Sequence, residues 1–229
     1  MIVITGASRG VGRYLFNEFA NNGFEVIGTY FSTPVSSDED SHGYFKVDIR
    51  DFQDVEVWVD SIKDNLKEVV LVNCAGTSYN SYAHKSNICL WKNVIDLNLI
   101  GTFNVIRNIL PVMRSQNYGR IINFSSVVSK LPTPGVSAYA ASKSGLNGLT
   151  RSLAIENASK GITVNSINLG YVNIGMGVEQ VPAEYQEKLK IQIPVGRFCE
   201  PIEIYNTVKY LIDTEYVNGS IIDVNGALI

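Results

Sequence analysis

Short apolar runs of high β-propensity alternate along the chain with stretches in which apolar residues return every three or four positions. The first run, residues 2–4, is followed by Val11, Leu15 and Phe19, which share one face of a helix that ends at Gly23. Six later runs predict strands at residues 24–30, 44–49, 69–73, 120–124, 162–167 and 220–224. The run at 69–73 is almost wholly apolar, which is typical of a strand covered by helices on both faces.

Helical patterns fill the intervals between these strands. Asp51 is placed to cap a helix, and a long helix is expected over residues 86–115, with Pro111 marking a bend or stop near its far end. Further helices are expected over residues 138 to about 159, closed by Gly161, and over 183–191 and 200–213. This alternation predicts an α/β fold in one domain, residues 1–229, with a doubly wound parallel sheet of about seven strands flanked by helices.

Composition narrows the class of protein. Of the 229 residues 45% are hydrophobic and 18% charged, which is ample for a core and argues against disorder. Nineteen Lys and Arg against 22 Asp and Glu give a net charge of −3 without a basic block, so no nucleic-acid partner is expected. No apolar run approaches the roughly 20 residues of a membrane helix, and the apolar start is too short for a secretory signal. We expect a cytoplasmic protein with no membrane partner.

The cysteines do not indicate a disulfide framework or a metal site. Cys74, Cys89 and Cys199 are odd in number and never in C-x-x-C spacing. Only His42 and His84 accompany them, so no bound metal is expected.

A glycine-rich turn, T-G-A-S-R-G-V-G at residues 5–12, joins the first strand to the first helix. Glycines permit a tight turn and let backbone N–H groups approach a pyrophosphate, which the helix N-terminus favours electrostatically. A purely structural turn is the alternative, but the position between strand and helix favours nucleotide binding. The candidate cofactor contacts here are Gly6, Ser8, Arg9, Gly10, Val11 and Gly12.

The T-G-x-x-x-G-x-G spacing resembles that of the short-chain dehydrogenase/reductase family. The resemblance covers essentially the whole chain, because further family motifs follow in order: N-C-A-G at residues 73–76, Asn98, Ser126 and Tyr139-x-x-x-Lys143. It implies a single NAD(P)-binding Rossmann domain and an oxidoreductase that interconverts a carbonyl and an alcohol on a small molecule. The G-A-S-R-G turn and the V-N-G ending are similar to those of 3-oxoacyl-carrier-protein reductases.

The candidate catalytic residues are Asn98, Ser126, Tyr139 and Lys143. Tyr139 and Lys143 are four apart on a predicted helix and share a face. We expect the ammonium to lower the phenol pKa from about 10, making Tyr139 a general acid/base. The resemblance implies that Ser126 bonds the substrate oxygen, with Ser125 as the alternative, and that Asn98 positions a water near the lysine. In the implied reaction, hydride passes from nicotinamide C4 to a carbonyl carbon while Tyr139 protonates the oxygen.

The second predicted strand decides the cofactor preference. It ends G-T-Y-F-S at residues 28–32 without the carboxylate that holds a ribose 2′-hydroxyl, and Arg9 suits a phosphate. We therefore expect NADP(H), with NAD(H) and a merely solvated Arg9 as alternatives. The resemblance implies that Asp48 contacts the adenine amino group, although a loop or capping role fits equally. The remaining candidate cofactor contacts are Ile49, Asn73, Ala75, Gly76, Tyr139, Lys143, Gly170 and Val172.

The chain departs from the family after the sixth strand. Leu169 and Ile174 stand where a proline and a threonine are usual, and the threonine hydroxyl that helps to hold the nicotinamide carboxamide is lost; backbone groups at Val172 remain available. Residues 172–198 are expected to form a substrate loop over the active site. Their apolar side chains either contact an apolar substrate or pack the loop onto the domain.

Apolar residues cover more than one face of both long helices, including Phe103 and Ile155. Relatives pack these helices across a two-fold axis, so a homotetramer or homodimer is expected, although a helix buried within a monomer would show the same pattern. Three functions stay open. They are an NADPH-dependent reductase like 3-oxoacyl-carrier-protein reductases, an enzyme of the same chemistry for another ketone or sugar-derived intermediate, and a non-catalytic NAD(P)-binding sensor or scaffold.

Overall fold

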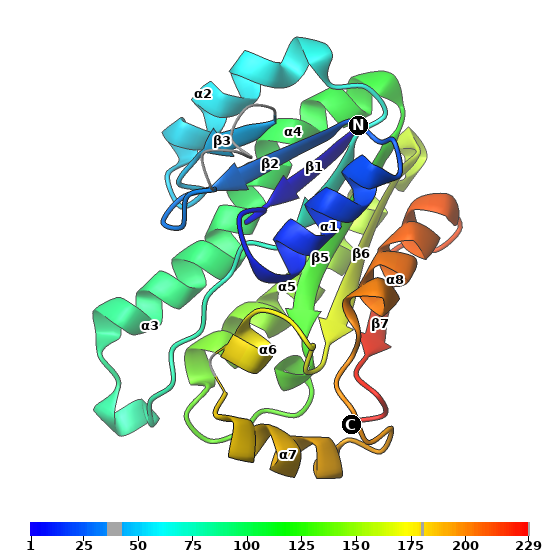
Figure 1. Ribbon diagram of the computed structural model, residues 1–229. Coiled ribbons are helices and arrows are strands. Elements are labelled where there is room, and N and C mark those ends of the chain that lie inside the picture. The colour runs from blue at the N-terminus through cyan, green and yellow to red at the C-terminus, as the bar shows by residue number, and fades with distance from the viewer. Residues whose placement is uncertain (36–42, 180, 229) are drawn as a thin grey trace.

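The computed structural model describes residues 1–35, 43–179 and 181–228, so His42 lies outside the described residues. One parallel sheet of seven strands has the order β3-β2-β1-β4-β5-β6-β7 (Figure 1). The doubly wound α/β Rossmann fold predicted from the sequence is therefore confirmed. The strands are β1 (Ile2–Thr5), β2 (Val26–Tyr30), β3 (Tyr44–Lys46), β4 (Val70–Asn73), β5 (Gly119–Ser126), β6 (Ile162–Leu169) and β7 (Ile221–Val224).

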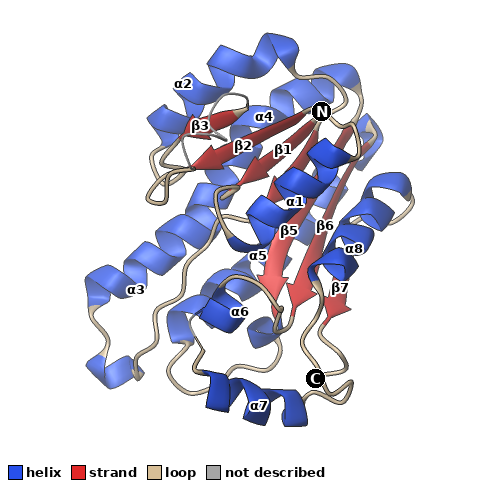
Figure 2. Ribbon diagram, viewed as in Figure 1, coloured by secondary structure: helices blue, strands red, loops and turns tan. Residues whose placement is uncertain are grey.

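Helices cover both faces of the sheet (Figure 2). Successive residues of a strand point to opposite faces, so each strand contributes apolar side chains to two separate cores. Val3 of β1 and Leu71 of β4 pack in the core under α2, α4 and α5, whereas Ile4 and Val72 pack under α1 and α8. These helices are α1 (Gly10–Asn21), α2 (Phe52–Ile62), α4 (Thr102–Gln116), α5 (Ser137–Asn157) and α8 (Pro201–Asp213).

Two helix boundaries follow the predicted signals. The Asp51 side chain caps α2 by accepting hydrogen bonds from the backbone N–H groups of Gln53 at 2.9 Å and Asp54 at 3.4 Å. Gly161, with φ +65°, ends the helical region that follows α5, because the left-handed conformation is open to glycine.

The long helix predicted over residues 86–115 is confirmed in extent, from Ile88 to Gln116, but its middle is not regular α-helix. It consists of α3 (Ile88–Ile95), a π-helical segment (Asp96–Gly101) and α4, which continues past Pro111 to Gln116. Pro111 does not stop the helix because it lies on the exposed side, where water can satisfy the carbonyl that loses its helical partner. The π segment carries the predicted catalytic residue Asn98.

Strands β5 and β6 are longer than predicted because the residues at their carboxyl ends include buried polar ones, which do not continue the apolar pattern of the strand. They pair from Gly119↔Ile162 to Ser126↔Leu169. The strand predicted at 44–49 is shorter than expected and ends at Lys46.

The carboxyl ends of the strands meet at one edge of the sheet. Two short helices, α6 (Met176–Glu179) and α7 (Ala183–Gln192), lie beyond the carboxyl ends of β5 and β6 (Figure 1). Leu189, Ile193 and Phe198 form a buried apolar cluster of their own in this segment. No helix in the described ranges is long and apolar enough to cross a membrane.

Candidate active site

A cavity of about 800 Å³ opens at the carboxyl edge of the sheet. In an open α/β sheet this edge binds ligands where the strand order reverses, here between β1 and β4. Most residues predicted to bind or react there line the cavity, namely Gly6, Ser8, Arg9, Gly10, Val11, Gly12, Asp48, Ile49, Ala75, Gly76, Ser126, Tyr139, Lys143, Gly170 and Val172.

The glycine turn leaves no room for side chains at its floor. A Cβ at Gly12 would lie 2.3 Å from the carbonyl oxygen of Gly6, and a Cβ at Gly6 would lie 2.8 Å from Ala75 Cα. Gly6 and Gly10 also have positive φ angles of +68° and +53°. The turn therefore presents bare backbone and the N-terminus of α1 to the cavity, an arrangement that binds phosphate groups.

Tyr139 and Ser126 line the same cavity, and the Ser126 hydroxyl acts to lower the pKa of the phenol. Ser126 ends β5, and Tyr139 lies in the first turn of α5. The neighbouring Ser125 donates its hydroxyl to the backbone oxygen of Lys143 at 3.0 Å. Of the two serines that the sequence left open, Ser125 is bonded to the backbone, whereas Ser126 is the one that influences the pKa of the phenol.

Lys143 is buried one helical turn after Tyr139. Its Nζ donates to the backbone oxygen of Phe124 at 2.5 Å and lies 5.6 Å from the centroid of the Tyr139 ring. Burial lowers the pKa of Lys143 to about 8, and the Cys74 thiol opposes that shift. The ammonium is therefore charged at neutral pH but close to losing its proton.

The expectation that Lys143 lowers the pKa of Tyr139 is wrong for this structure. Burial raises the pKa of Tyr139, and the hydrogen bond with Ser126 opposes that rise. Lys143 is not among the causes of this net rise; its ammonium donates to the Phe124 carbonyl and lies 5.6 Å from the centroid of the Tyr139 ring. A phenol with a raised pKa is protonated at neutral pH and can donate a proton.

Asn98 is fully buried and hydrogen-bonds the loop after β4 to α5. Its Nδ2 donates to Thr77 O at 2.9 Å and to Ser142 Oγ at 3.0 Å, and its Oδ1 accepts from Thr77 N–H at 2.8 Å. A Cβ on Gly76 would lie 3.3 Å from Asn98 Oδ1 and 3.7 Å from Lys143 Nζ, so both side chains approach this glycine. The predicted role in positioning water stays a prediction.

Asn73 does not belong to the lining of the cavity. It is buried in β4, where its Nδ2 donates to Asn123 Oδ1 at 2.9 Å, and Asn123 donates in turn to Thr150. Its side chain cross-links β4 and β5 behind the cavity wall, which does not support direct cofactor contact through that side chain.

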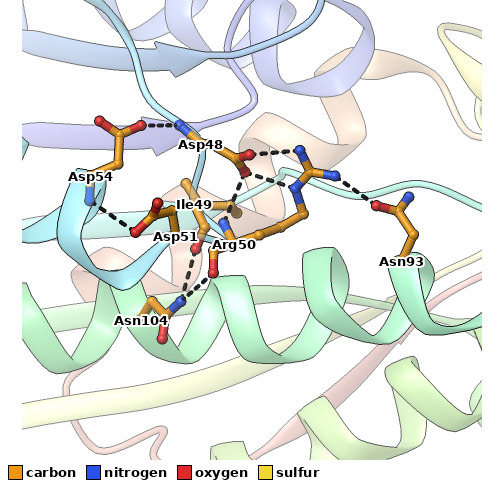
Figure 3. Close-up of polar contacts among 7 residues, drawn as sticks. All are labelled: Asp48, Ile49, Arg50, Asp51, Asp54, Asn93 and Asn104. Atoms are coloured by element: carbon orange, nitrogen blue, oxygen red, sulfur yellow. Dashed lines mark hydrogen bonds and ion pairs between the residues drawn. The ribbon is translucent and has the colours of Figure 1, made fainter. Parts of the chain in front are cut away.

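Asp48 lies at the far end of the cavity in a cluster that the sequence did not predict (Figure 3). Both carboxylate oxygens accept hydrogen bonds from the Arg50 guanidinium, and this bonding lowers the pKa of Asp48. The only signal in the sequence is the D-x-R spacing, which is too common to single out Arg50.

The segment over residues 172–198, predicted to form a substrate loop, is consistent with both interpretations of its apolar side chains. Met176 and Tyr185 line the cavity, Ile193 packs in the separate apolar cluster, and Val181 and Leu189 do both. Ile174, which stands where the family resemblance predicts a threonine, packs its side chain against the core below α1. It therefore makes apolar contacts and offers no hydroxyl. Within the described ranges, no three His, Cys, Asp or Glu residues are grouped to hold a metal.

Comparison with known proteins decides the family. A model described as short chain dehydrogenase matches residues 1–184. The chain belongs to the short-chain dehydrogenase/reductase family. It is 36% identical over 242 residues to a 3-oxoacyl-[acyl-carrier-protein] reductase of Staphylococcus aureus strain N315, covering 99% of this chain and 96% of that protein. It is 34% identical over 232 residues to an acetoacetyl-CoA reductase of Shinella zoogloeoides, covering 98% and 96%.

This short-chain dehydrogenase/reductase is thus an NAD(P)-dependent oxidoreductase, as the sequence predicts. The residues present fit a nicotinamide dinucleotide, because the turn has only backbone at Gly6 and Gly12, where a Cβ would collide with neighbouring backbone atoms. Such a side-chain-free turn lets a pyrophosphate approach the backbone closely. Ser126, Tyr139 and Lys143 line the same cavity.

Proposed function

We propose that this chain reduces the carbonyl of a small 3-oxoacyl thioester to a hydroxyl with NADPH, using Tyr139 as general acid. The observation that carries the proposal is that Ser126, Tyr139 and Lys143, the last one turn along the helix from Tyr139, line the same cavity as the glycine turn. The named activities of the two relatives, both 3-oxoacyl thioester reductases, support this substrate class.

The bound cofactor would supply a hydride to the carbonyl carbon. Tyr139 gives its phenolic proton to the carbonyl oxygen, so that one C–H bond and one O–H bond form and the C=O double bond becomes single. Ser126 donates a hydrogen bond to the same oxygen and steadies the developing negative charge. The Lys143 ammonium keeps positive charge beside the phenol as the proton leaves.

NADPH is the proposed cofactor because residues 28–32 offer no carboxylate to a ribose 2′-hydroxyl and Arg9 is exposed on the glycine turn. NAD(H) is the alternative. Oxidation of NADPH and NADH by the purified protein in the presence of acetoacetyl-CoA measures the preference directly.

A panel of ketones tests the substrate class. We expect acetoacetyl-CoA to be reduced with a higher kcat/KM than cyclic ketones or sugar-derived ketones. A higher kcat/KM for another ketone would favour the second function left open by the sequence. Nucleotide binding without turnover on any substrate would favour the sensor and contradict the proposed reduction.

We also propose that the chain forms a homotetramer or homodimer. Of the apolar helix residues behind that expectation, Ile106 and Leu153 are buried within the chain, whereas Phe103 is 42% and Ile155 is 83% exposed. Exposed apolar side chains on helices of this length are available to a second copy. Sedimentation equilibrium measures the mass; a monomer would contradict the proposal. A cytoplasmic location stays a prediction from the sequence.

A further inference from the structure

The far end of the cavity holds a charged pair with well-defined geometry (Figure 3). Arg50 binds Asp48 side-on: Nε donates to Oδ1 at 2.8 Å and Nη2 to Oδ2 at 2.6 Å. The remaining terminal nitrogen, Nη1, donates to Asn93 Oδ1 on α3 at 2.7 Å. Two parallel bonds to one carboxylate fix both charges in place, unlike a single contact between flexible side chains.

The backbone beneath this pair is held from two sides. Asp54 of α2 accepts from the Asp48 N–H at 2.6 Å. Asn104 of α4 donates to the backbone oxygens of Ile49 at 3.0 Å and Arg50 at 3.3 Å. The backbone that carries Asp48 and Arg50 is therefore fixed by α2 and α4, and the positions of the two charges are determined by the fold.

The pair faces the segment that follows β2. The Cζ atom of Arg50 lies 5.2 Å from the centroid of the Phe31 ring, and Phe31 comes directly after the last residue of β2. In dinucleotide-binding folds the end of this strand is the corner that distinguishes a ribose 2′-hydroxyl from a 2′-phosphate. Asp48 thus brings a carboxylate into a corner where residues 28–32 supply none.

An unpaired carboxylate in this corner would repel a 2′-phosphate, which carries up to two negative charges. Among the described residues that line the cavity, the charged ones on the β1–β3 half of the sheet are Arg9, Asp48 and Arg50. With Arg50 paired to Asp48, the net charge of the three is +1; without Arg50 it is zero, and the carboxylate is bare.

We propose that Arg50 determines the preference for a 2′-phosphorylated cofactor, and that it does so by neutralising Asp48. This inference rests on the proposed use of NADPH. Arg50 is a positioning residue in this account: it acts through Asp48, and the phosphate itself meets Arg9 and the backbone of the glycine turn.

Isothermal titration with 2′,5′-ADP and 5′-AMP tests this without any turnover, because the two ligands differ only in the 2′-phosphate. We expect the unaltered protein to bind 2′,5′-ADP more tightly. Arg50→Met should reduce the ratio of the two affinities by about tenfold, the size expected for partly screened charges several ångströms apart. Asp48→Asn alone should raise the ratio, and the double variant Arg50→Met/Asp48→Asn should recover most of it.

Two further variants separate charge from structure. Asn93→Ala removes a bond to Arg50 but no charge, so the ratio should stay within about threefold of the original. Arg107→Met is the matched control, because Arg107 also lies over an aromatic ring, Phe52 at 5.5 Å, but outside the cavity. Should Arg50→Met fail to fold, judged by circular dichroism, Arg50→Gln takes its place.

Recovery in the double variant supports the proposal. Three results overturn it: an unchanged ratio in Arg50→Met, an equal loss of affinity for both ligands, or a double variant as poor as Arg50→Met, which would mean that Arg50 binds the phosphate itself. Failure of the proposed reduction would be seen separately, as intact 2′,5′-ADP selectivity in a protein that oxidises no NADPH.

Discussion

The Nζ atom of Lys143 lies 2.5 Å from the backbone carbonyl oxygen of Phe124, and this bond holds a buried ammonium beside the Tyr139 ring. Burial brings the lysine pKa down to about 8, while it raises that of the phenol. The two shifts leave a charged lysine next to a protonated tyrosine at neutral pH. That combination suits a site that gives a proton away, as the reduction of a carbonyl requires.

The pH dependence of the reduction follows from the lysine. Lys143 carries its charge below pH about 8 and loses it above, so kcat/KM for the ketone should fall as pH rises through that value. The phenol stays protonated over this range because its pKa is raised. Lys143→Arg, which keeps a charge at every pH tested, should show a lower but flat profile. A wild-type rate that rises through pH 8 would contradict the assignment.

Removing the Lys143 charge should lower activity but raise the free energy of unfolding. An unfolded lysine has a pKa near 10.5 and the folded one about 8, so burying the ammonium costs stability below pH 8, and this cost fades as pH rises to 10.5. Lys143→Met should therefore raise the free energy of unfolding at pH 7 by up to about 3 kcal/mol. Urea unfolding at pH 7 and pH 10 measures this. A variant less stable at pH 7 would show that the Phe124 bond outweighs the burial.

The segment that follows β6 packs against the glycine turn at Gly175. Gly175 has φ +65°, and a Cβ there would lie 3.0 Å from Gly10 Cα. Gly175→Ala should cost about 1–2 kcal/mol in stability and weaken NADPH binding, because Gly10 must shift. Gly148→Ala is the matched control: no heavy atom lies within 4 Å of its Cβ position in α5, so it should stabilise the protein by about 0.5–1 kcal/mol. Calorimetric unfolding and NADPH titration check both. Equal effects of the two substitutions would contradict the contact.

Arg120 anchors the end of α8 far from the cavity. It is buried in β5, where Nε donates to Ile212 O at 3.1 Å and Nη1 to Gly161 O at 3.1 Å, and Nη2 pairs with Glu215 at 3.4 Å. Arg120→Met should destabilise the protein by about 3 kcal/mol, because three backbone carbonyls, those of Gly119, Gly161 and Ile212, lose a donor. Glu215→Gln should cost under about 1 kcal/mol, since that carboxylate is 84% exposed. Urea unfolding measures both, and equal losses would show that the ion pair matters more than the carbonyl bonds.

The sheet could be predicted from the sequence because its apolar strands and glycine signals are local. The ends of β5 and β6 could not, since buried polar residues such as Ser125 and Asn168 lack an apolar signature and are satisfied by distant partners. The π segment around Asn98 leaves no mark in residue periodicity.

Most of the candidate site could be read from motifs, but its electrostatics could not. The direction of the Tyr139 pKa shift depends on burial and on where Lys143 points, which spacing alone does not determine. Arg50 was missed because its role depends on Asn93, 43 positions along the chain, and on Phe31 in another loop.

Proton donation by Tyr139 is tested most directly by the single-turnover rate of acetoacetyl-CoA reduction in Tyr139→Phe with NADPH already bound. We expect the rate to fall at least about 100-fold while the NADPH dissociation constant changes little, and Tyr210→Phe, a change at an exposed tyrosine outside the cavity, to leave both unaltered. A Tyr139→Phe protein that reduces the ketone at the original rate would contradict the account.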